Sequence, residues 1–300
     1  MIKEVVFNIF NNTEVGRLCL PVGVSYENTK AYVISPLHGR SVALKTPIGW
    51  ISIKGGGWNY GGPQVYISQK DEELIFGLYN LTSAERELAV SREIEKFSDD
   101  FPKVLYYKKI ADVPLPPQLS FLHDVTFANG AKVDPCLLYT KLNCPFRVAD
   151  LMYLSEEEKR TIIKDSCNGW GISLSDYTVT FVKKLTDRVA LLHKHGFIND
   201  TLDYGNVTLM AEIVDYEWVT APGIKLPDGS DGQIICDERR EKEILYGTEV
   251  CLQLFALLHQ PYDLFSIYCD FVGEYERINP EFVKSNTRIQ KILNREEFIL

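Results

Sequence analysis

The sequence predicts an α+β protein with two lobes, an N-terminal lobe over residues 1–145 and a C-terminal lobe over residues 146–300. The first third contains short runs rich in β-branched and aromatic residues, typical of strands separated by turns: EVVFNIF, SVALKT, GWISIKG and QVYISQ. From about residue 147 the apolar residues recur mainly at helical spacing. We therefore expect a mixed β-sheet in the first lobe and a mainly helical second lobe.

One helix and one further strand are expected in the N-terminal lobe. The segment LTSAERELAVSREIEKF predicts a helix over 83–97, with Thr82 or Ser83 as its N-cap. PCLLYTKL predicts a buried strand over 135–142. In the C-terminal lobe, helical periodicity marks four segments: ADLMYLSEEEKRTIIKD, DYTVTFVKKLTDRVALLHKH, EKEILYGTEVCLQLFALLHQ and YDLFSIYCDFVGEYERI.

Charge and composition exclude several classes of function. The formal net charge of −9 and a pI near 5.2 argue against non-specific binding to nucleic acid or to an anionic membrane surface. No uninterrupted apolar run is long enough to predict a transmembrane helix, and the N-terminal apolar run is too short for a secretory signal. The seven cysteines are scattered and form no CxxC motif, so we expect a cytoplasmic protein without a zinc site or a disulfide framework.

A lysine at the end of an apolar strand is the first candidate for binding phosphate. Lys54 ends the run WISIK and is followed by three glycines, which allow a backbone to approach a nucleotide closely. The helix over 83–97 carries several glutamates, one of which could reach back to hold this lysine. Taken alone, Lys54 is also compatible with an ordinary turn, and the glutamates with a solvated helix face.

The second candidate is a polar loop followed by a short hairpin. Asn206 and Asp215 are nine residues apart, and the segment VTLMAEIVD between them can fold back so that their side chains meet. An amide oxygen and a carboxylate suit Mg²⁺, which completes its shell with water and phosphate oxygens. Either residue alone would equally fit a turn. His193 and His195 precede the loop, and we interpret them as structural or helix-terminal histidines rather than metal ligands.

With these segments in order, the sequence resembles the kinase-like fold, and within it the selenoprotein-O family of protein AMPylases, which are pseudokinase-type adenylyltransferases. HGRSVALKTPIGWISIKGGGW resembles the strand pair of that family that ends in a lysine-glycine turn, which implies that Lys54 binds the nucleotide phosphates. AERELAVSREIEKF resembles the helix that follows, which implies that Glu87 pairs with this lysine.

Two more segments extend the resemblance into the second lobe. LLYTKLNCPFRVADL resembles a stretch that supplies two basic residues to the phosphates, which implies this role for Lys141 and Arg147. HGFIN and the step from Asn206 to the Asp-Tyr pair resemble the family's loop and its DFG-like motif. Asn206 and Asp215 are then the implied metal ligands.

The loop departs from its relatives where a catalytic base would be expected. A protein kinase has an aspartate five residues before the metal-binding asparagine, and this position is Thr201. The AMPylases have an aspartate directly before the asparagine, and this position is Gly205. We expect Asp203, or as second choice Asp200, to supply the acidic group. Glu217 replaces the glycine of the family's Asp-Tyr-Gly and could help to orient a metal ion.

The sequence therefore predicts a transferase that uses ATP and Mg²⁺, with Mn²⁺ as an alternative metal, and transfers AMP to an acceptor hydroxyl. The acceptor would be a protein or a small molecule. Two alternatives remain open: a phosphotransferase that uses ATP in the usual orientation, and a non-catalytic pseudokinase that serves as a binding module.

Overall fold

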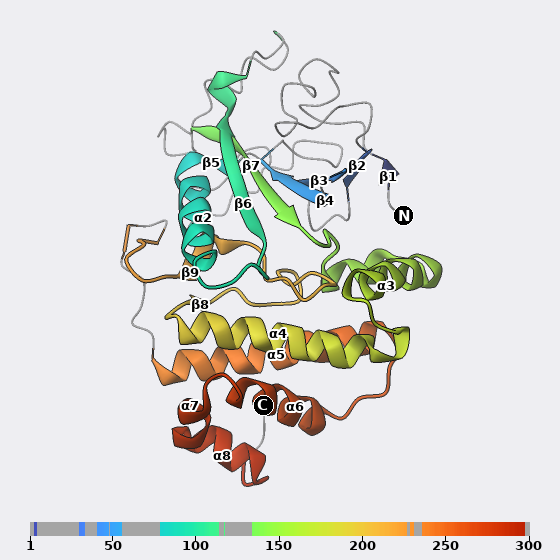
Figure 1. Cartoon of the computed structure of the whole chain (residues 1–300), viewed down its shortest axis with the longest axis vertical. Coiled ribbons are helices and arrows are strands. Elements are labelled where there is room, and N and C mark those ends of the chain that lie inside the picture. The colour runs from blue at the N-terminus through green and yellow to red at the C-terminus, as the bar shows by residue number, and fades with distance from the viewer. Residues whose placement is uncertain are drawn as a thin grey trace. The chain divides into compact units, whose positions relative to one another are not determined.

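The structure is a computed structural model that describes residues 3–4, 30–33, 41–47, 49–55, 79–113, 117, 134–226, 229–230 and 236–297. The predicted run QVYISQ and most of EVVFNIF lie outside these residues. The described part is an α+β protein in which antiparallel strands and helices are largely segregated along the chain (Figure 1). Among the described residues, no helix is both long and apolar enough to cross a membrane.

The chain divides into two compact units. The first unit comprises Met1–Arg92 and Pro102–Pro145, and the second comprises Glu93–Phe101 and Phe146–Leu300. The main division falls between residues 145 and 146, and the sequence did not indicate that the short segment Glu93–Phe101 groups with the second unit. Arg188 of the second unit explains this grouping, because its guanidinium donates hydrogen bonds to the carbonyl oxygens of Asp100 at 2.9 Å and Met210 at 3.0 Å.

All pairs among the described strands of the first unit are antiparallel, so the expected mixed sheet is wrong for these strands. Their order is β1-β2-β3-β4-β7-β5, with β6 also paired to β7. Since β6 pairs with β7 along one edge, β4 and β5 share the other edge, one after the other. The strands are β1 (Lys3–Glu4), β2 (Lys30–Val33), β3 (Ser41–Thr46), β4 (Gly49–Lys54), β5 (Tyr79–Asn80), β6 (Lys103–Lys109) and β7 (Pro135–Leu142). The strand expected over 135–142 is confirmed as β7.

Helix α2 (Leu81–Ile94) follows directly from strand β5. It begins two residues before the predicted start, so Thr82 and Ser83 lie inside its first turn and the predicted N-cap is wrong. The reason is tertiary, because the backbone N–H of Leu81 donates to the carbonyl oxygen of Asp134 at 2.9 Å. This bond satisfies a helix-terminal N–H that would otherwise need a side-chain cap. The helix also ends at Ile94, three residues before the predicted end.

The second unit is mainly helical. Its helices are α3 (Glu156–Trp170), α4 (Tyr177–Lys194), α5 (Asp237–Leu257), α6 (Leu264–Glu276), α7 (Pro280–Ser285) and α8 (Thr287–Leu293). Helices α4, α5 and α6 pack against one another around a buried core that includes Phe181, Leu185 and Phe271. A Cβ built on Gly247 of α5 would lie 2.4 Å from the Phe271 ring, so glycine permits the close contact between α5 and α6.

Between α4 and α5 the chain forms the polar loop and hairpin expected from the sequence. A two-stranded antiparallel sheet, β8 (Ile198–Asn199) with β9 (Val219–Thr220), closes this region at its base. The 3-10 helix η7 (Val148–Tyr153) lies against the hairpin, because the Val148 N–H donates to the carbonyl oxygen of Val207 at 2.9 Å. Backbone hydrogen bonds thus hold this region in two places, at the β8–β9 pair and at η7.

Candidate functional site

A buried ion pair joins strand β4 to helix α2 in the first unit. Lys54 Nζ donates to Glu87 Oε1 at 2.7 Å, and both side chains are almost fully buried. The Tyr79 hydroxyl donates to the same carboxylate oxygen, and Lys54 Nζ lies 4.7 Å from the centre of the Tyr79 ring. Glu87 therefore does not belong to a solvated helix face. The structure brings together the lysine and the glutamate that the sequence singled out.

Helix α2 is fixed over one face of the sheet by side-chain hydrogen bonds to strand β6. The Tyr107 hydroxyl donates to Glu85 Oε1 at 3.0 Å, and the backbone N–H of Val104 donates to Ser91 Oγ at 2.9 Å. Tyr107 and Lys54 both lie in register with Leu138 of β7, so their side chains project from the same face of the sheet. The helix thus covers the face that carries Lys54.

The glycine after Lys54 is required by its surroundings. Gly55 has a φ of +94°, and a Cβ built there would lie 2.3 Å from the Cys136 carbonyl oxygen and 2.7 Å from Tyr79 Cβ. Such distances exclude any side chain without a shift of the backbone. Gly55 therefore lets strand β4 end where strand β5 begins along the edge of β7, and this places Lys54 beside Tyr79.

Lys141 does not join this group in the first unit. It lies on β7 in register with Ile51 of β4, whereas Lys54 lies in register with Leu138. Because side chains alternate between the faces of a strand, Lys141 and Lys54 project from opposite faces of the sheet. The Lys141 side chain is exposed. The structure of this unit gives no support for the predicted phosphate-binding role of Lys141.

The loop of the second unit is held by Arg147. Its guanidinium Nη1 donates to the Gly205 carbonyl oxygen at 2.5 Å and to Asn206 Oδ1 at 3.2 Å. The amide group of Asn206 is oriented by a second bond, in which Nδ2 donates to the Thr201 carbonyl oxygen at 2.8 Å. Arg147 therefore positions the loop within its own unit, a role that the sequence did not predict.

Asn206 and Asp215 lie at the two ends of the predicted hairpin. Val207 and Ile213 form an antiparallel bridge, and the Val214 N–H donates to the Asn206 carbonyl oxygen at 2.9 Å. This bond places Asp215 directly after the residue that pairs with Asn206, so the segment between them folds back as the predicted hairpin. Asp215 has a φ of +67°, a left-handed conformation that is uncommon outside glycine and concentrates at functional sites.

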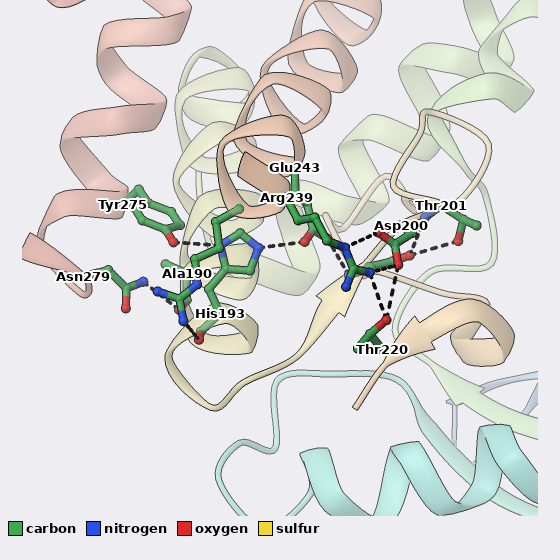
Figure 2. A network of polar contacts seen from close by, with 11 residues as sticks. Ala190, His193, Asp200, Thr201, Thr220, Arg239, Glu243, Tyr275 and Asn279 are labelled. Atoms are coloured by element: carbon green, nitrogen blue, oxygen red, sulfur yellow. Dashed lines mark hydrogen bonds and ion pairs between the residues drawn. The ribbon is translucent and has the colours of Figure 1, made fainter. Parts of the chain in front are cut away.

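The two candidate acidic residues of the loop differ in their contacts. Asp200 forms an ion pair with Arg239 of α5, and the Thr220 hydroxyl also donates to it at 3.3 Å (Figure 2). Asp203 is exposed, and its Oδ1 accepts a hydrogen bond from the Gly205 N–H at 2.6 Å. Partial desolvation nevertheless raises the pKa of the Asp203 carboxyl group, although the backbone N–H donors of Gly205 and Asn206 oppose this. These contacts favour Asp203 over Asp200 as the acidic group.

Figure 2 also shows a polar network that the sequence did not reveal, which joins helices α4, α5 and α6 through buried side chains. His193 Nε2 lies 2.6 Å from Glu243 Oε2, and its Nδ1 lies 2.7 Å from the Tyr275 hydroxyl. Glu243 Oε1 accepts the backbone N–H of Asn199 at 2.9 Å. Burial raises the pKa of Glu243 against the opposing influence of His193. His193 is therefore a structural histidine, as interpreted from the sequence. The His195 ring stacks on the Phe97 ring, with their centres 3.9 Å apart.

Comparison with known proteins adds no assignment to this geometry. No protein-family model matches the chain, and no curated protein matches it significantly. The resemblance noted in the sequence therefore stays a prediction.

Proposed function

We propose that this protein is an ATP- and Mg²⁺-dependent transferase with a bilobal kinase-like fold, and that it transfers AMP to an acceptor hydroxyl. The observation that carries the proposal is the buried Lys54–Glu87 ion pair between β4 and α2. Moving two opposite charges from water into the protein interior is costly, and an apolar pair of similar volume would often stabilise a fold equally well. A buried lysine oriented by a glutamate is instead well suited to bind the phosphates of a nucleotide.

Asn206 and Asp215 are proposed as the residues that would hold Mg²⁺ in the second unit. Their oxygen donors match this hard cation, and Asn206 Oδ1 keeps acceptor capacity beyond its bond to Arg147, because an amide oxygen has two lone pairs. The left-handed backbone of Asp215 supports a functional position. A bound Mg²⁺ would supply positive charge that neutralises the triphosphate. Glu217, which is buried two residues after Asp215, is a further oxygen donor of the same segment.

Asp203 is proposed to accept the proton of the acceptor hydroxyl. In AMP transfer the hydroxyl oxygen forms a bond to the α-phosphorus, the bond between the α- and β-phosphates breaks, and pyrophosphate leaves. A carboxyl group with a raised pKa accepts a proton more readily than an ordinary aspartate. Thr201, at the position where a protein kinase has its base, has no comparable basicity.

Product analysis tests the proposal directly. Incubation with ATP and Mg²⁺ should yield pyrophosphate and an adduct with the mass of an adenylyl group, and Lys54→Ala should abolish both nucleotide binding and product. Lys45→Ala, at an exposed position of neighbouring strand β3, is the matched control and should behave like the unchanged chain. Nucleotide binding that survives Lys54→Ala would refute the assignment of Lys54.

A phosphotransferase is the second candidate function. Glu217, which occupies the position of the glycine in the family's Asp-Tyr-Gly, favours it, because acidic residues follow the metal-binding aspartate in some small-molecule kinases. In this case ADP would be released and the adduct would have the mass of a phosphoryl group. Nucleotide binding without either product would instead indicate the third candidate, a non-catalytic pseudokinase that serves as a binding module.

A cytoplasmic location is part of the same proposal. All six cysteines that the structure describes are free thiols, which suits a reducing compartment. Subcellular fractionation with an antibody against the chain would test it, and recovery in a secreted fraction would refute it.

A further inference from the structure

A cavity of about 270 Å³ lies beside the loop of the second unit. One wall is formed by five consecutive loop residues, from Asp200 to Tyr204, and the other by Tyr246, Glu249 and Val250 of helix α5. The cavity thus combines the loop that carries Asp203 with a rigid helix. Ligand pockets for whole cofactors span roughly 300–1,000 Å³. This cavity is therefore suited to a small group rather than to an entire nucleotide.

The charge of the cavity is negative and is not balanced by its own walls. Asp200 is neutralised by Arg239, but Asp203 and Glu249 add two further carboxylates. None of the residues that line the cavity is basic. Among the residues that the structure describes, none forms an ion pair with Glu249. A ligand with a positive charge would supply the missing partner.

Aromatic rings provide a second kind of attraction for a cation. Tyr204 and Tyr246 both line the cavity, and the face of a tyrosine ring attracts ammonium groups. The Tyr246 ring already shows this property, because Lys242 Nζ lies 5.4 Å from its centre. Leu202 and Val250, which are buried, line the same cavity and could cover the apolar part of a bound amine.

We propose that this cavity binds a positively charged group of the acceptor, a primary amine or a guanidinium attached to the molecule that carries the reacting hydroxyl. Binding of the cation follows from the cavity alone, whereas its identity as the acceptor rests on the proposed function. Asp203 lines the cavity and is also the proposed proton acceptor. A cation seated between Glu249 and Tyr246 would hold the acceptor close to this carboxylate.

Calorimetric titration without ATP tests the cavity independently of catalysis. The probes are 6-aminohexan-1-ol and heptan-1-ol, which differ in that a methyl group replaces the ammonium. We expect the amine to bind at least about tenfold more tightly, which corresponds to about 1.4 kcal/mol. A second arm compares a peptide with serine next to lysine and a peptide with serine next to norleucine. This arm distinguishes a protein acceptor from a small-molecule acceptor.

Variants then locate the binding. Glu249→Gln and Tyr246→Leu should each weaken the amine several-fold, while Glu281→Gln, an exposed carboxylate on α7 of the same unit, should leave it unchanged. Glu249 is exposed, so its variant should fold normally. Equal binding of charged and neutral probes in both arms, or no effect of Glu249→Gln, would overturn the inference.

The two proposals fail separately. Selective amine binding without any transfer from ATP would remove the proposed function and keep the cation site. AMP transfer with no preference for charged acceptors would keep the proposed function and remove the cation site.

Discussion

Glu243 of helix α5 accepts the backbone N–H of Asn199 at 2.9 Å and thereby ties the helical core of the second unit to the start of its polar loop. The other oxygen of the same carboxylate faces His193, which in turn contacts Tyr275. All three side chains are buried. The loop that carries Asp203 and Asn206 therefore starts from a backbone fixed by a side chain of the core.

Replacement of Glu243 should separate charge from hydrogen bonding. Glu243→Leu leaves His193 Nε2 and the Asn199 N–H without the hydrogen-bond partner that Glu243 supplies to each, and each buried polar group left unsatisfied costs about 1–3 kcal/mol. Glu243→Gln keeps an acceptor for Asn199 and a donor for the imidazole, so it should cost far less. Chemical denaturation gives both free energies of unfolding. Equal losses for the two variants would mean that the hydrogen bonds do not matter.

Variants of the Lys54–Glu87 pair should separate the effect on stability from the effect on nucleotide binding. Lys54→Met removes the ammonium group that pairs with the buried Glu87 carboxylate and should destabilise the chain by about 3–5 kcal/mol. The double variant Lys54→Met with Glu87→Leu removes both charges and should recover much of that loss. Neither variant should bind ATP. Thermal unfolding with and without ATP checks both points, and ATP binding by the double variant would contradict the proposed role.

The sequence predicted those parts of the fold that depend on local patterns. Strand β7 and the helices α4 to α6 follow from apolar periodicity, and the hairpin from Asn206 to Asp215 follows from spacing. The helical segment predicted from residue 149 was right only in part, because it is divided into the 3-10 helix η7 and helix α3, which starts at Glu156 after the Ser155 cap. The start of α2 was misjudged because the bond between Leu81 and Asp134 joins residues far apart in the sequence. No local signal in the sequence reports such a contact.

The candidate site was predicted unevenly for the same reason. Lys54 and Glu87 could be paired because a strand end and a helix face are both visible in the pattern. Arg147 was assigned to phosphates, and the bond from its side chain to the Gly205 carbonyl oxygen became apparent only from the tertiary structure. Glu243 and Glu249 lie on one helix, and nothing in their spacing showed that the first is buried and the second lines a cavity.

Gly55→Ala should be strongly destabilising. The variant would adopt an unfavourable φ of +94° and place its Cβ against the Cys136 carbonyl oxygen, so strain and overpacking together should cost about 2–4 kcal/mol. Gly171→Ala is the matched control, because its φ is +68° but nothing lies within 4 Å of the added Cβ. We expect a loss of about 1 kcal/mol there. Denaturant titrations of both variants make the comparison, and similar losses would remove the steric argument.

The capping box of helix α3 should make stability sensitive to acid. The Ser155 hydroxyl and backbone N–H donate to Glu158 and lower the pKa of this carboxyl group to about 2. A lowered pKa means that the contribution to stability is present above the ordinary pKa of about 4.3 and is lost as the pH falls towards 2. Glu158→Gln should flatten the pH profile of the melting temperature in this window, whereas Glu157→Gln should leave it unchanged.

Arg147 allows a test of whether it holds the loop or binds phosphate. Arg147→Met removes the bonds to the Gly205 carbonyl oxygen and to Asn206 Oδ1, so amide hydrogen exchange at residues 205 and 206 should accelerate even without nucleotide. If the side chain only positions the loop, the affinities for ATP, ADP and AMP should fall by similar factors. A loss that grows with the number of phosphates, with unchanged exchange, would restore the phosphate-binding role. Arg160→Met, at an exposed site on α3, controls for the loss of one positive charge.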